Sequence, residues 1–327
     1  SEHPAQYTTV GARPPQFSSA APGATRDPDR AGPPPSRRDG CYAAILRANA
    51  AMRQDGPVFR PPSEADSILL QATVGCSHNG CRFCGMYRDR RFRVRTRAEI
   101  TADLAEAAAQ APAAGRVFLC DGDALAAPQA ALVELLEGIR RWLPSVSRVA
   151  TYANARSIAG KTDAELGELR ALGMRLLHVG LESGDDVTLR AMNKHGDARL
   201  HVEQGRRARA AGMRLFVTVL LGLGGVERSA AHAVATAQAL SEMQPDYVGA
   251  LSLMLVPGTP LHDAAARGAF VLPGPQGLLG ELRTLLERVE LRGIFYANHA
   301  SNYLPLRARL PRDRAAALGA LDAALSG

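Results

Sequence analysis

The stretch Cys76-Ser77-His78-Asn79-Gly80-Cys81-Arg82-Phe83-Cys84 places three thiols within nine residues. It follows the apolar run 67–74 and precedes the arginine-rich segment 88–97. A closed structural zinc site requires four ligands, whereas a catalytic metal site keeps one position open. Three thiolates can bind three irons of a [4Fe–4S] cube and leave the fourth iron free. The stretch therefore predicts an open metal site, and we expect the chemistry at that free iron.

The cysteine count supports metal use. Of the five cysteines, Cys41 and Cys120 lie far from the stretch in sequence, and an odd number argues against a disulfide framework. The pattern favours a reducing compartment. The alternative is a zinc site that takes His78 or Cys120 as a distant ligand, although zinc ligands usually come as spaced pairs. Cys120 ends a predicted core strand, where a cysteine commonly acts as a small hydrophobe.

Composition sets the broad class. The chain has 327 residues, 46% of them hydrophobic, which is enough for one large α/β domain. Its formal net charge of +7 suits an anionic or zwitterionic small ligand, and we expect neither nucleic acid nor a membrane as partner. No apolar run reaches the roughly 18 residues of a membrane span, and the start lacks signal-peptide architecture. We therefore expect a cytoplasmic protein.

The chain divides into four parts. Residues 1–38 are rich in Pro, Gly, Ser and Ala and predict a disordered or loosely wrapped arm. Residues 39–65 predict a short helical lead-in, and residues 66–270 alternate strand and helix patterns. Residues 271–327 form a C-terminal segment that we expect to close the core and contribute to the substrate site.

Six predicted strands are each followed by a polar or Gly-rich loop and then a helix. They cover residues 67–74, 116–120, 148–152, 175–181, 214–221 and 247–256. Repeated βα units imply a parallel sheet with right-handed crossovers. Six units predict a partial (β/α)6 TIM-like barrel, whose ligands gather at the carboxyl ends of the strands.

With its flanking strand and helix, the cysteine loop resembles the radical S-adenosylmethionine (radical SAM) superfamily over about residues 66–260. The usual spacing there is three residues and then two, whereas this chain has Cys76-x4-Cys81-x2-Cys84. We expect Gly80 to absorb the extra residue by adopting a positive φ. The resemblance implies that Phe83 lies against the adenine, and the run 75–95 is similar to a branch without a cobalamin-binding domain.

The resemblance also implies the reaction. S-adenosylmethionine would bind the open iron through its amino and carboxylate groups, and an electron from the reduced cluster would split the sulfonium–C5′ bond. The 5′-deoxyadenosyl radical would then abstract hydrogen from a small organic substrate, while the protein binds and orients the cofactors. An electron donor such as flavodoxin or ferredoxin would dock on Arg88, Arg90, Arg91, Arg93, Arg95 and Arg97. A solvated charged face is the alternative for these arginines.

Asp121-Gly122-Asp123 follows the second strand, where the family has a Gly-Gly-Glu-like motif that binds the cofactor ammonium. Backbone carbonyls and a carboxylate are what an amino group needs, so all three residues are cofactor candidates. A turn with two solvated acids is the alternative.

Further cofactor candidates follow later strands. Glu182 and Ser183 end the fourth strand, where the resemblance implies a polar contact to the ribose or methionine part. Lys194 would pair with the cofactor carboxylate or form a solvated helix end. Gly222 and Gly224 match a glycine-rich stretch near the adenine, although a tight turn also explains them.

The remaining candidates concern ribose and substrate. Asn154, after the third strand, is a cofactor candidate that could equally form a turn, and Tyr152 is a substrate candidate. His299, Asn302 and Tyr303 are substrate candidates because the C-terminal segment often sets specificity in such enzymes. A hydrogen-bonded packing segment is the alternative for them.

Two rival functions stay open at this point. The first keeps the radical SAM chemistry but makes the substrate RNA or a peptide, bound through the arginine-rich surface. The second is a non-catalytic metal- or cluster-binding protein in which the cysteine loop is structural.

Overall fold

An eight-stranded sheet organises the chain in the computed structural model, which describes residues 37–326. Its strand order is β1-β4-β5-β6-β7-β8-β9-β10, and only the last pair, β9–β10, is antiparallel. The strands are β1 (Ile68–Gln71), β4 (Arg116–Cys120), β5 (Arg148–Ala153), β6 (Met174–Glu182), β7 (Arg214–Leu221), β8 (Tyr247–Ser252), β9 (Ile294–Tyr296) and β10 (Arg307–Arg309).

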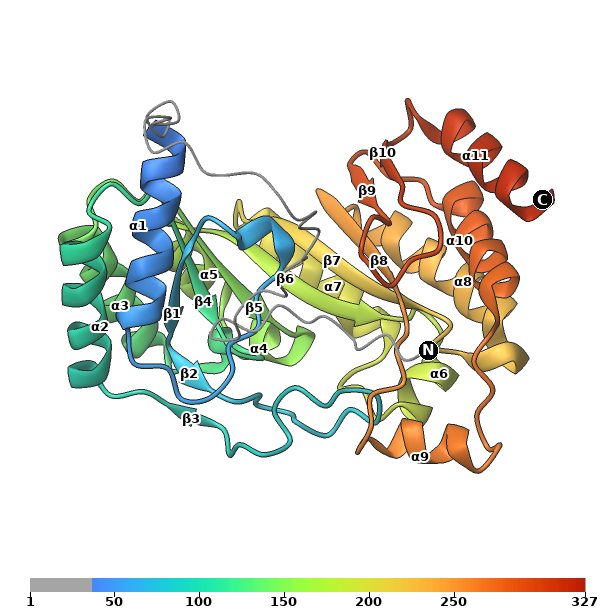
Figure 1. The fold of residues 1–327 in the computed structure, drawn as a ribbon, viewed down its shortest axis with the longest axis horizontal. Helices are drawn as coiled ribbons and strands as arrows, with labels where there is room; N and C mark the ends of the chain where they lie inside the picture. Colours follow the sequence, from blue (N-terminus) through green and yellow to red (C-terminus); the bar gives the residue numbers. More distant parts are fainter. Residues whose placement is uncertain (1–36, 327) are drawn as a thin grey trace, which may run out of the picture.

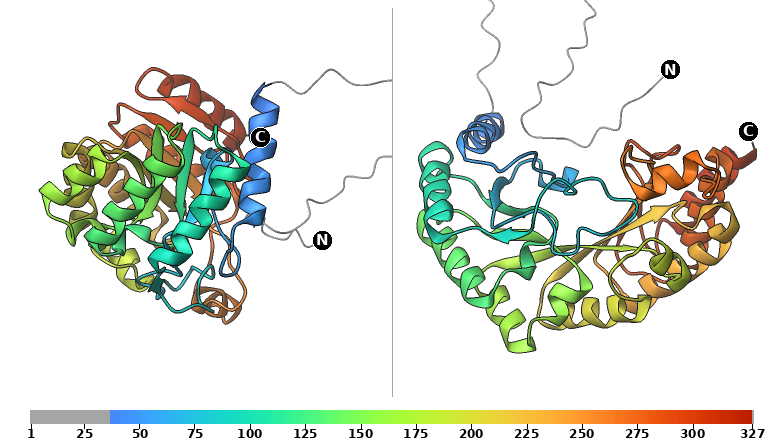
Figure 2. Two further views of the ribbon diagram at one scale, coloured as in Figure 1. Left: turned by 90° about the vertical axis from the view of Figure 1, so that its left-hand side faces the viewer. Right: turned by 90° about the horizontal axis from the view of Figure 1, so that it is seen from below.

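The sheet curves into an open crescent with the longer helices on its outer side (Figures 1 and 2). The predicted α/β fold, a partial barrel of parallel strands, is confirmed. The longer helices are α1 (Arg37–Ala51), α2 (Arg97–Gln110), α3 (Gln129–Trp142), α5 (Asp163–Ala171), α7 (Ala198–Ala210), α8 (Gly225–Met243), α10 (Pro275–Arg288) and α11 (Arg314–Ser326). Shorter ones are η1 (Pro62–Glu64), η2 (Ala124–Ala126), α4 (Ala155–Ala159), α6 (Asp186–Ala191) and α9 (Pro260–Ala266).

Two predicted segments differ in extent from the structure. Residues 1–36 of the predicted arm lie outside the described residues, and α1 begins at the last two residues of that arm. The C-terminal segment adds β9 and β10 beyond β8, and its helix α10 packs against α8. Among the helices of residues 37–326, none has the length and apolarity that a membrane crossing requires.

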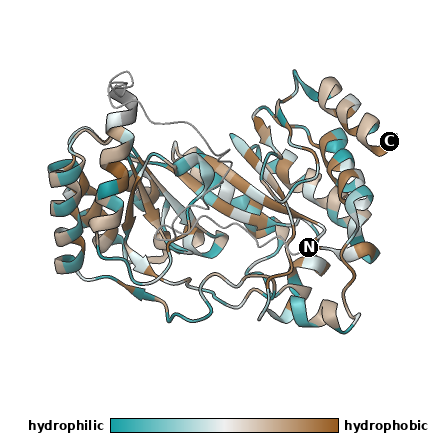
Figure 3. Ribbon diagram, in the orientation of Figure 1, coloured by the Kyte–Doolittle hydropathy of each residue, from teal (hydrophilic) through white to brown (hydrophobic). Residues whose placement is uncertain are grey.

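The side-chain pattern of β7 explains how the two faces of the sheet differ. Leu215, Val217 and Val219 are buried on the helix-covered face, whereas Phe216 and Thr218 are half-buried on the inner face. This alternation follows from the two-residue period of a strand, and Figure 3 shows alternating bands along the long strands. The helix-covered face is the more buried of the two and holds the hydrophobic core. The inner face is therefore more accessible to solvent and ligands.

Local signals place the helices that follow the strands. Thr96 and Glu99, three residues apart as a capping box requires, form this reciprocal box at the start of α2. Thr162 and Glu165 do the same for α5. Each box satisfies backbone N–H groups that the first helical turn leaves without partners.

Candidate active site

The cysteine loop is a long excursion closed by its own small sheet. Strand β2 (Thr73–Val74) pairs antiparallel with β3 (Arg93–Val94), so both ends of the loop are fixed. Gly75, with φ 80°, makes the turn into the loop. All three thiols are half-buried and unpaired. The three cysteines are therefore presented by one anchored segment.

The prediction that Gly80 absorbs the extra loop residue is wrong. Asn79 takes the left-handed conformation, with φ 47°, and Gly80 is not among the glycines of positive φ in the described chain. The Asn79 amide donates to the carbonyls of Tyr87 at 2.6 Å and Arg90 at 3.2 Å. These bonds stabilise a conformation that asparagine tolerates better than most residues.

Burial raises the pKa values of two of the three thiols of the loop. Burial raises the pKa of Cys81 to about 11, against the opposing attraction of Lys194. Burial also raises the pKa of Cys84, and a hydrogen bond from the Met86 backbone partly offsets this. Within residues 37–326, no three His, Cys, Asp or Glu side chains are close enough to hold one metal ion. A cube bonds each thiolate to a different iron, so the sulfurs need not converge on one point.

Glu182 and Lys194 form a buried ion pair beside the thiols. Lys194 Nζ lies 3.0 Å from Glu182 Oε1, and each side chain is 11% exposed. Burial lowers the pKa of Lys194, but the attraction of Glu182 and then of Cys81 outweighs it and holds this pKa above its usual value. Lys194 is thus a fixed positive charge next to the loop. Its predicted pairing with a cofactor carboxylate stays a prediction.

Asp121 is buried and points toward the start of the cysteine loop. It accepts hydrogen bonds from the Gly75 N–H at 2.7 Å and from Gln71 Nε2 at 3.2 Å. The backbone N–H of Gly122 donates to the Gly75 carbonyl at 3.0 Å. A Cβ on Gly122 would lie 2.6 Å from the Cβ of Cys76, so only glycine allows this approach. In this structure Asp121 and Gly122 hold the loop, and their cofactor role stays a prediction.

Asp123 differs from Asp121 in the hydrogen bonds that its two carboxylate oxygens accept. Its Oδ2 accepts hydrogen bonds from Ser77 Oγ and from Asn154 Nδ2, the latter at 2.6 Å. Its Oδ1 is buried and finds no hydrogen-bond partner in the part of the chain that the structure describes. Burial raises the pKa of Asp123 to about 6. A buried carboxylate oxygen without a partner is costly, which points to a donor supplied from outside the chain.

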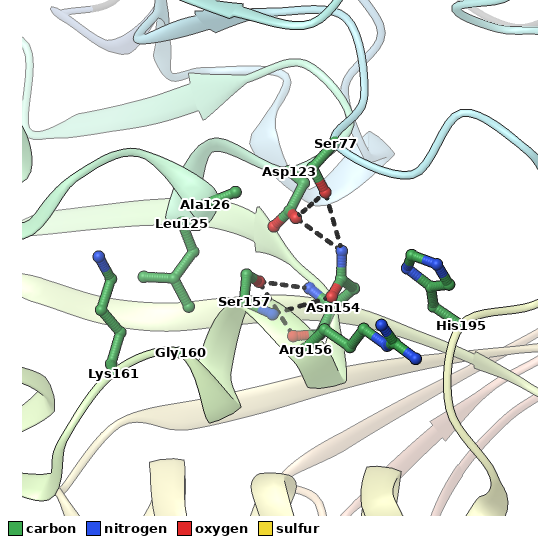
Figure 4. Close-up of a pocket in the computed structure, with 10 residues that line it drawn as sticks. All are labelled: Ser77, Asp123, Leu125, Ala126, Asn154, Arg156, Ser157, Gly160, Lys161 and His195. Atoms are coloured by element: carbon green, nitrogen blue, oxygen red, sulfur yellow. Dashed lines mark hydrogen bonds between the residues drawn. The ribbon is translucent and has the colours of Figure 1, made fainter.

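Asp123 lines a cavity of about 270 Å³ beside the cysteine loop (Figure 4). The loop contributes Ser77, η2 and α4 contribute further walls, and His195 lies across from Lys161. Several of these positions carry no recognisable motif in the sequence, although the Asn154–Ser157 spacing is a capping-box signal for the start of α4. The missed lining residues are Ser77, Leu125, Ala126, Arg156, Ser157, Gly160, Lys161 and His195.

Four other cofactor candidates take part in hydrogen bonds or packing contacts within the fold. Ser183 Oγ lies 2.7 Å from His232 Nδ1, in a buried network that the sequence reasoning did not find. The N–H of Gly222 donates to Glu281 at 2.6 Å, and Gly224 directly precedes α8. Phe83 packs beside the apolar cluster of Met192, Leu223, Leu253 and Leu261. The cofactor roles of these four candidates stay predictions.

The C-terminal candidates lie against β8. Asn302 accepts a hydrogen bond from the Ser252 N–H at 2.7 Å and donates to the Ala250 carbonyl at 2.8 Å, as a neighbouring strand would. His299 Nδ1 lies 2.8 Å from Ser301 Oγ. Tyr303 is 59% exposed, and Tyr152 packs near Phe118 on the inner face. The contacts of Asn302 support the packing alternative, and the substrate roles stay predictions.

Comparison with known families agrees with this geometry. The Radical SAM superfamily profile matches residues 70–236, a little more than half of the chain. The chain belongs to the radical SAM superfamily. Radical SAM proteins are enzymes that use a [4Fe–4S] cluster and S-adenosylmethionine, so the predicted enzyme class and both cofactors are confirmed.

Two radical SAM relatives match part of the chain. The mitochondrial radical S-adenosyl methionine domain-containing protein 1 of Bos taurus is 29% identical over 194 residues, 57% of this chain and 42% of that protein. Biotin synthase of Alkalilimnicola ehrlichii is 24% identical over 217 residues, 62% of this chain and 60% of that protein. This chain thus spans only about half the length of these relatives.

A solved structure has the same fold. The radical S-adenosylmethionine methyltransferase TsrM from Kitasatospora setae, with tryptophan and a SAM analogue bound, superposes with a TM-score of 0.56. It is 17% identical, and the match covers 78% of this chain and 57% of TsrM.

Proposed function

We propose that this protein binds one [4Fe–4S] cluster through Cys76, Cys81 and Cys84 and cleaves S-adenosylmethionine reductively in order to abstract hydrogen from a small organic substrate. When bound, the cluster and S-adenosylmethionine together supply the 5′-deoxyadenosyl radical. The chain's own residues bind, orient and shield these groups. The observation that carries this proposal is Asp123: it lines the cavity next to the cysteine loop, and its buried Oδ1 finds no hydrogen-bond partner within residues 37–326.

Asp123 suits the ammonium of S-adenosylmethionine. A charge-assisted hydrogen bond from that ammonium would satisfy Oδ1, while Ser77 and Asn154 keep Oδ2 in place. The cavity volume of about 270 Å³ is enough for the amino-acid part of the cofactor. Because Ser77 follows Cys76 directly, the same contact fixes the carboxylate relative to the thiols.

Lys194 and the Met86 backbone favour negative charge at the thiols, whereas the carboxylate of Glu182 opposes it. Lys194 is held positive by Glu182 and lies near Cys81 and Cys76. The N–H of Met86 stabilises the thiolate of Cys84. Both features lower the energy of a negatively charged centre at the loop. We place the protein in a reducing compartment such as the cytoplasm, because three of its five cysteines lie within nine residues, too close together for a disulfide framework.

Only part of the arginine-rich segment is available to an electron donor. Arg95 is 1% exposed and pairs with Asp103, and Arg93 pairs with Asp55 and Glu99. Arg88 is exposed and donates to the carbonyls of Cys84 at 2.8 Å and Cys81 at 2.7 Å. Arg82, between those cysteines, is also exposed. We assign the docking of an acidic reductant to Arg82 and Arg88.

The deciding experiment measures 5′-deoxyadenosine after anaerobic cluster reconstitution, with dithionite as reductant and S-adenosylmethionine as substrate. The wild type should form it, and Cys76→Ala, Cys81→Ala and Cys84→Ala should lose both the iron and the product. Cys41→Ala, on α1, is the matched thiol control and should keep both. Wild-type protein with an intact cluster that forms no 5′-deoxyadenosine would refute the proposed function.

A further inference from the structure

Two segments that are far apart in sequence interlock beside the thiols. The cysteine loop meets residues 192–196, which follow α6. Asn193 Nδ2 donates to the Gly80 carbonyl at 2.8 Å, and the Asn193 carbonyl lies 2.5 Å from His78 Nε2. The backbone N–H of Arg82 donates to the Met192 carbonyl at 2.9 Å. We call these contacts the clamp.

The left-handed backbone of Asn193 indicates that its side-chain amide has a role at this position. Asn193 is left-handed, with φ 51°, a conformation that glycine adopts without strain. Asparagine at this position supplies an amide that glycine lacks, and that amide reaches Gly80. A Cβ on Gly80 would lie 2.9 Å from Asn193 Nδ2, so the two residues fit closely.

The clamp joins the thiols to the cofactor cavity. Lys194, next to Asn193, pairs with Glu182 at 3.0 Å. His195 lines the cavity together with Asp123, and its ring stacks on that of His78 with centroids 3.6 Å apart. His78 belongs to the loop, so the stack connects the loop to the cavity wall.

We propose that Asn193 is a positioning residue that holds the cysteine loop against the wall of the cofactor cavity, so that the thiols and Asp123 face the same S-adenosylmethionine. This inference rests on the proposed function. It also gives the four-residue cysteine spacing a role, because His78 and Gly80 contact the clamp and Asn79 shapes the loop between them. The extra residue lets the loop reach residues 192–196.

Two variants test the clamp from opposite sides. Asn193→Gly keeps the left-handed backbone and removes the amide. The KM for S-adenosylmethionine should rise about two- to tenfold, the size expected for one hydrogen bond, with kcat changed less. Gly80→Ala should act in the same direction by displacing the Asn193 side chain. In both variants the cluster should still form, and the change in its EPR spectrum on adding S-adenosylmethionine should be weaker than in the wild type.

Gln244→Gly is the matched control. Gln244 is also left-handed, with φ 53°, and its side chain donates to the Ser241 carbonyl at 2.6 Å at the end of α8. This variant loses a comparable amide away from the site and should keep the wild-type KM and EPR response.

Hydrogen exchange of the Arg82 amide reports the clamp in the protein without cofactors. Exchange should be faster in Asn193→Gly than in wild type or Gln244→Gly, while the thermal midpoint shows that each variant is folded. If both clamp variants match the control in exchange, EPR response and KM, the inference is wrong. If the wild type does not cleave S-adenosylmethionine, the proposed function is wrong. Hydrogen exchange and the EPR response then still show whether the clamp holds the loop.

Discussion

The carboxylate of Asp121 accepts a hydrogen bond from the backbone N–H of Gly75 at 2.7 Å, which ties the end of β4 to the residue before Cys76. Gln71, at the end of β1, donates to the same carboxylate. Asp121 is fully buried and has a positive φ of 69°. One buried carboxylate thus joins two neighbouring strand ends to the start of the cysteine loop.

Replacing Asp121 by Asn should therefore destabilise the protein. The new NH2 group faces the donors Gly75 and Gln71, so at least one buried hydrogen bond is lost, at a cost of about 1–3 kcal/mol. Chemical denaturation of the cofactor-free protein measures this change. Asp66→Asn is the control, because the Asp66 side chain is 56% exposed, and its effect should stay within about 0.5 kcal/mol. Equal stabilities for the two variants would contradict the anchoring role.

Asp121 and Asp123 have different roles that the local sequence does not predict. Asp121 and Asp123 are the same residue type, two positions apart in one turn, and no local pattern distinguishes them. Their roles diverge through partners distant in sequence. Gln71 and Gly75 donate hydrogen bonds to Asp121. Ser77 and Asn154 donate to only one oxygen of Asp123, and the other accepts no hydrogen bond from the residues that the structure describes.

Features encoded within a few residues were predictable. The capping boxes at Thr96 and Thr162 and the parallel order of the main strands followed from spacing and periodicity. Strands β9 and β10 did not, because three residues are too few to show a two-residue period. The choice of Asn79 over Gly80 for the left-handed position depends on carbonyls of Tyr87 and Arg90, which a local rule about glycine does not include.

His201 should make stability depend on pH. It is buried on α7, and burial followed by repulsion from Lys194 lowers its pKa to about 4. Between pH 4 and 6.5 the unfolded state binds the proton more strongly, so the contribution of His201 to stability falls as the pH falls. The wild type should lose roughly 3 kcal/mol relative to His201→Gln between pH 7 and pH 4.

Comparison with this variant is needed because other groups oppose His201. The buried Asp121 and Asp123 have pKa values raised to about 6 by burial, and they favour the folded state as the pH falls. Their effect is common to both proteins and cancels in the difference. Urea denaturation at several pH values gives the difference, and a difference that does not change with pH would disprove this assignment.

Arg82 should affect reduction by a protein donor but not by a small one. With reduced flavodoxin as donor, Arg82→Gln should slow 5′-deoxyadenosine formation about three- to tenfold at low salt, because a charge at the docking surface is lost. The effect should shrink at high salt, which screens exposed charges. With dithionite the rate should be unchanged.

Arg97→Gln is the control, since Arg97 is also exposed but pairs with Glu134 at 2.7 Å on the adjoining helices. Equal slowing by both variants would indicate a general charge effect instead of a docking site.

Asp123 should set the pH dependence of cofactor binding. Burial raises its pKa to about 6, so its carboxylate is ionised above that pH and protonated below it. An ammonium group is attracted only to the ionised form, and the KM for S-adenosylmethionine should therefore rise as the pH falls from 7 to 5.

Asp123→Asn keeps the size of the side chain but removes the charge, which should raise KM about 10- to 100-fold, as expected for a lost charge-assisted hydrogen bond. The KM of this variant should vary little across the same pH range. Iron content and the cluster absorbance at each pH confirm that the cluster is intact. If the variant keeps the wild-type KM and its pH dependence, the ammonium does not bind at Asp123 Oδ1.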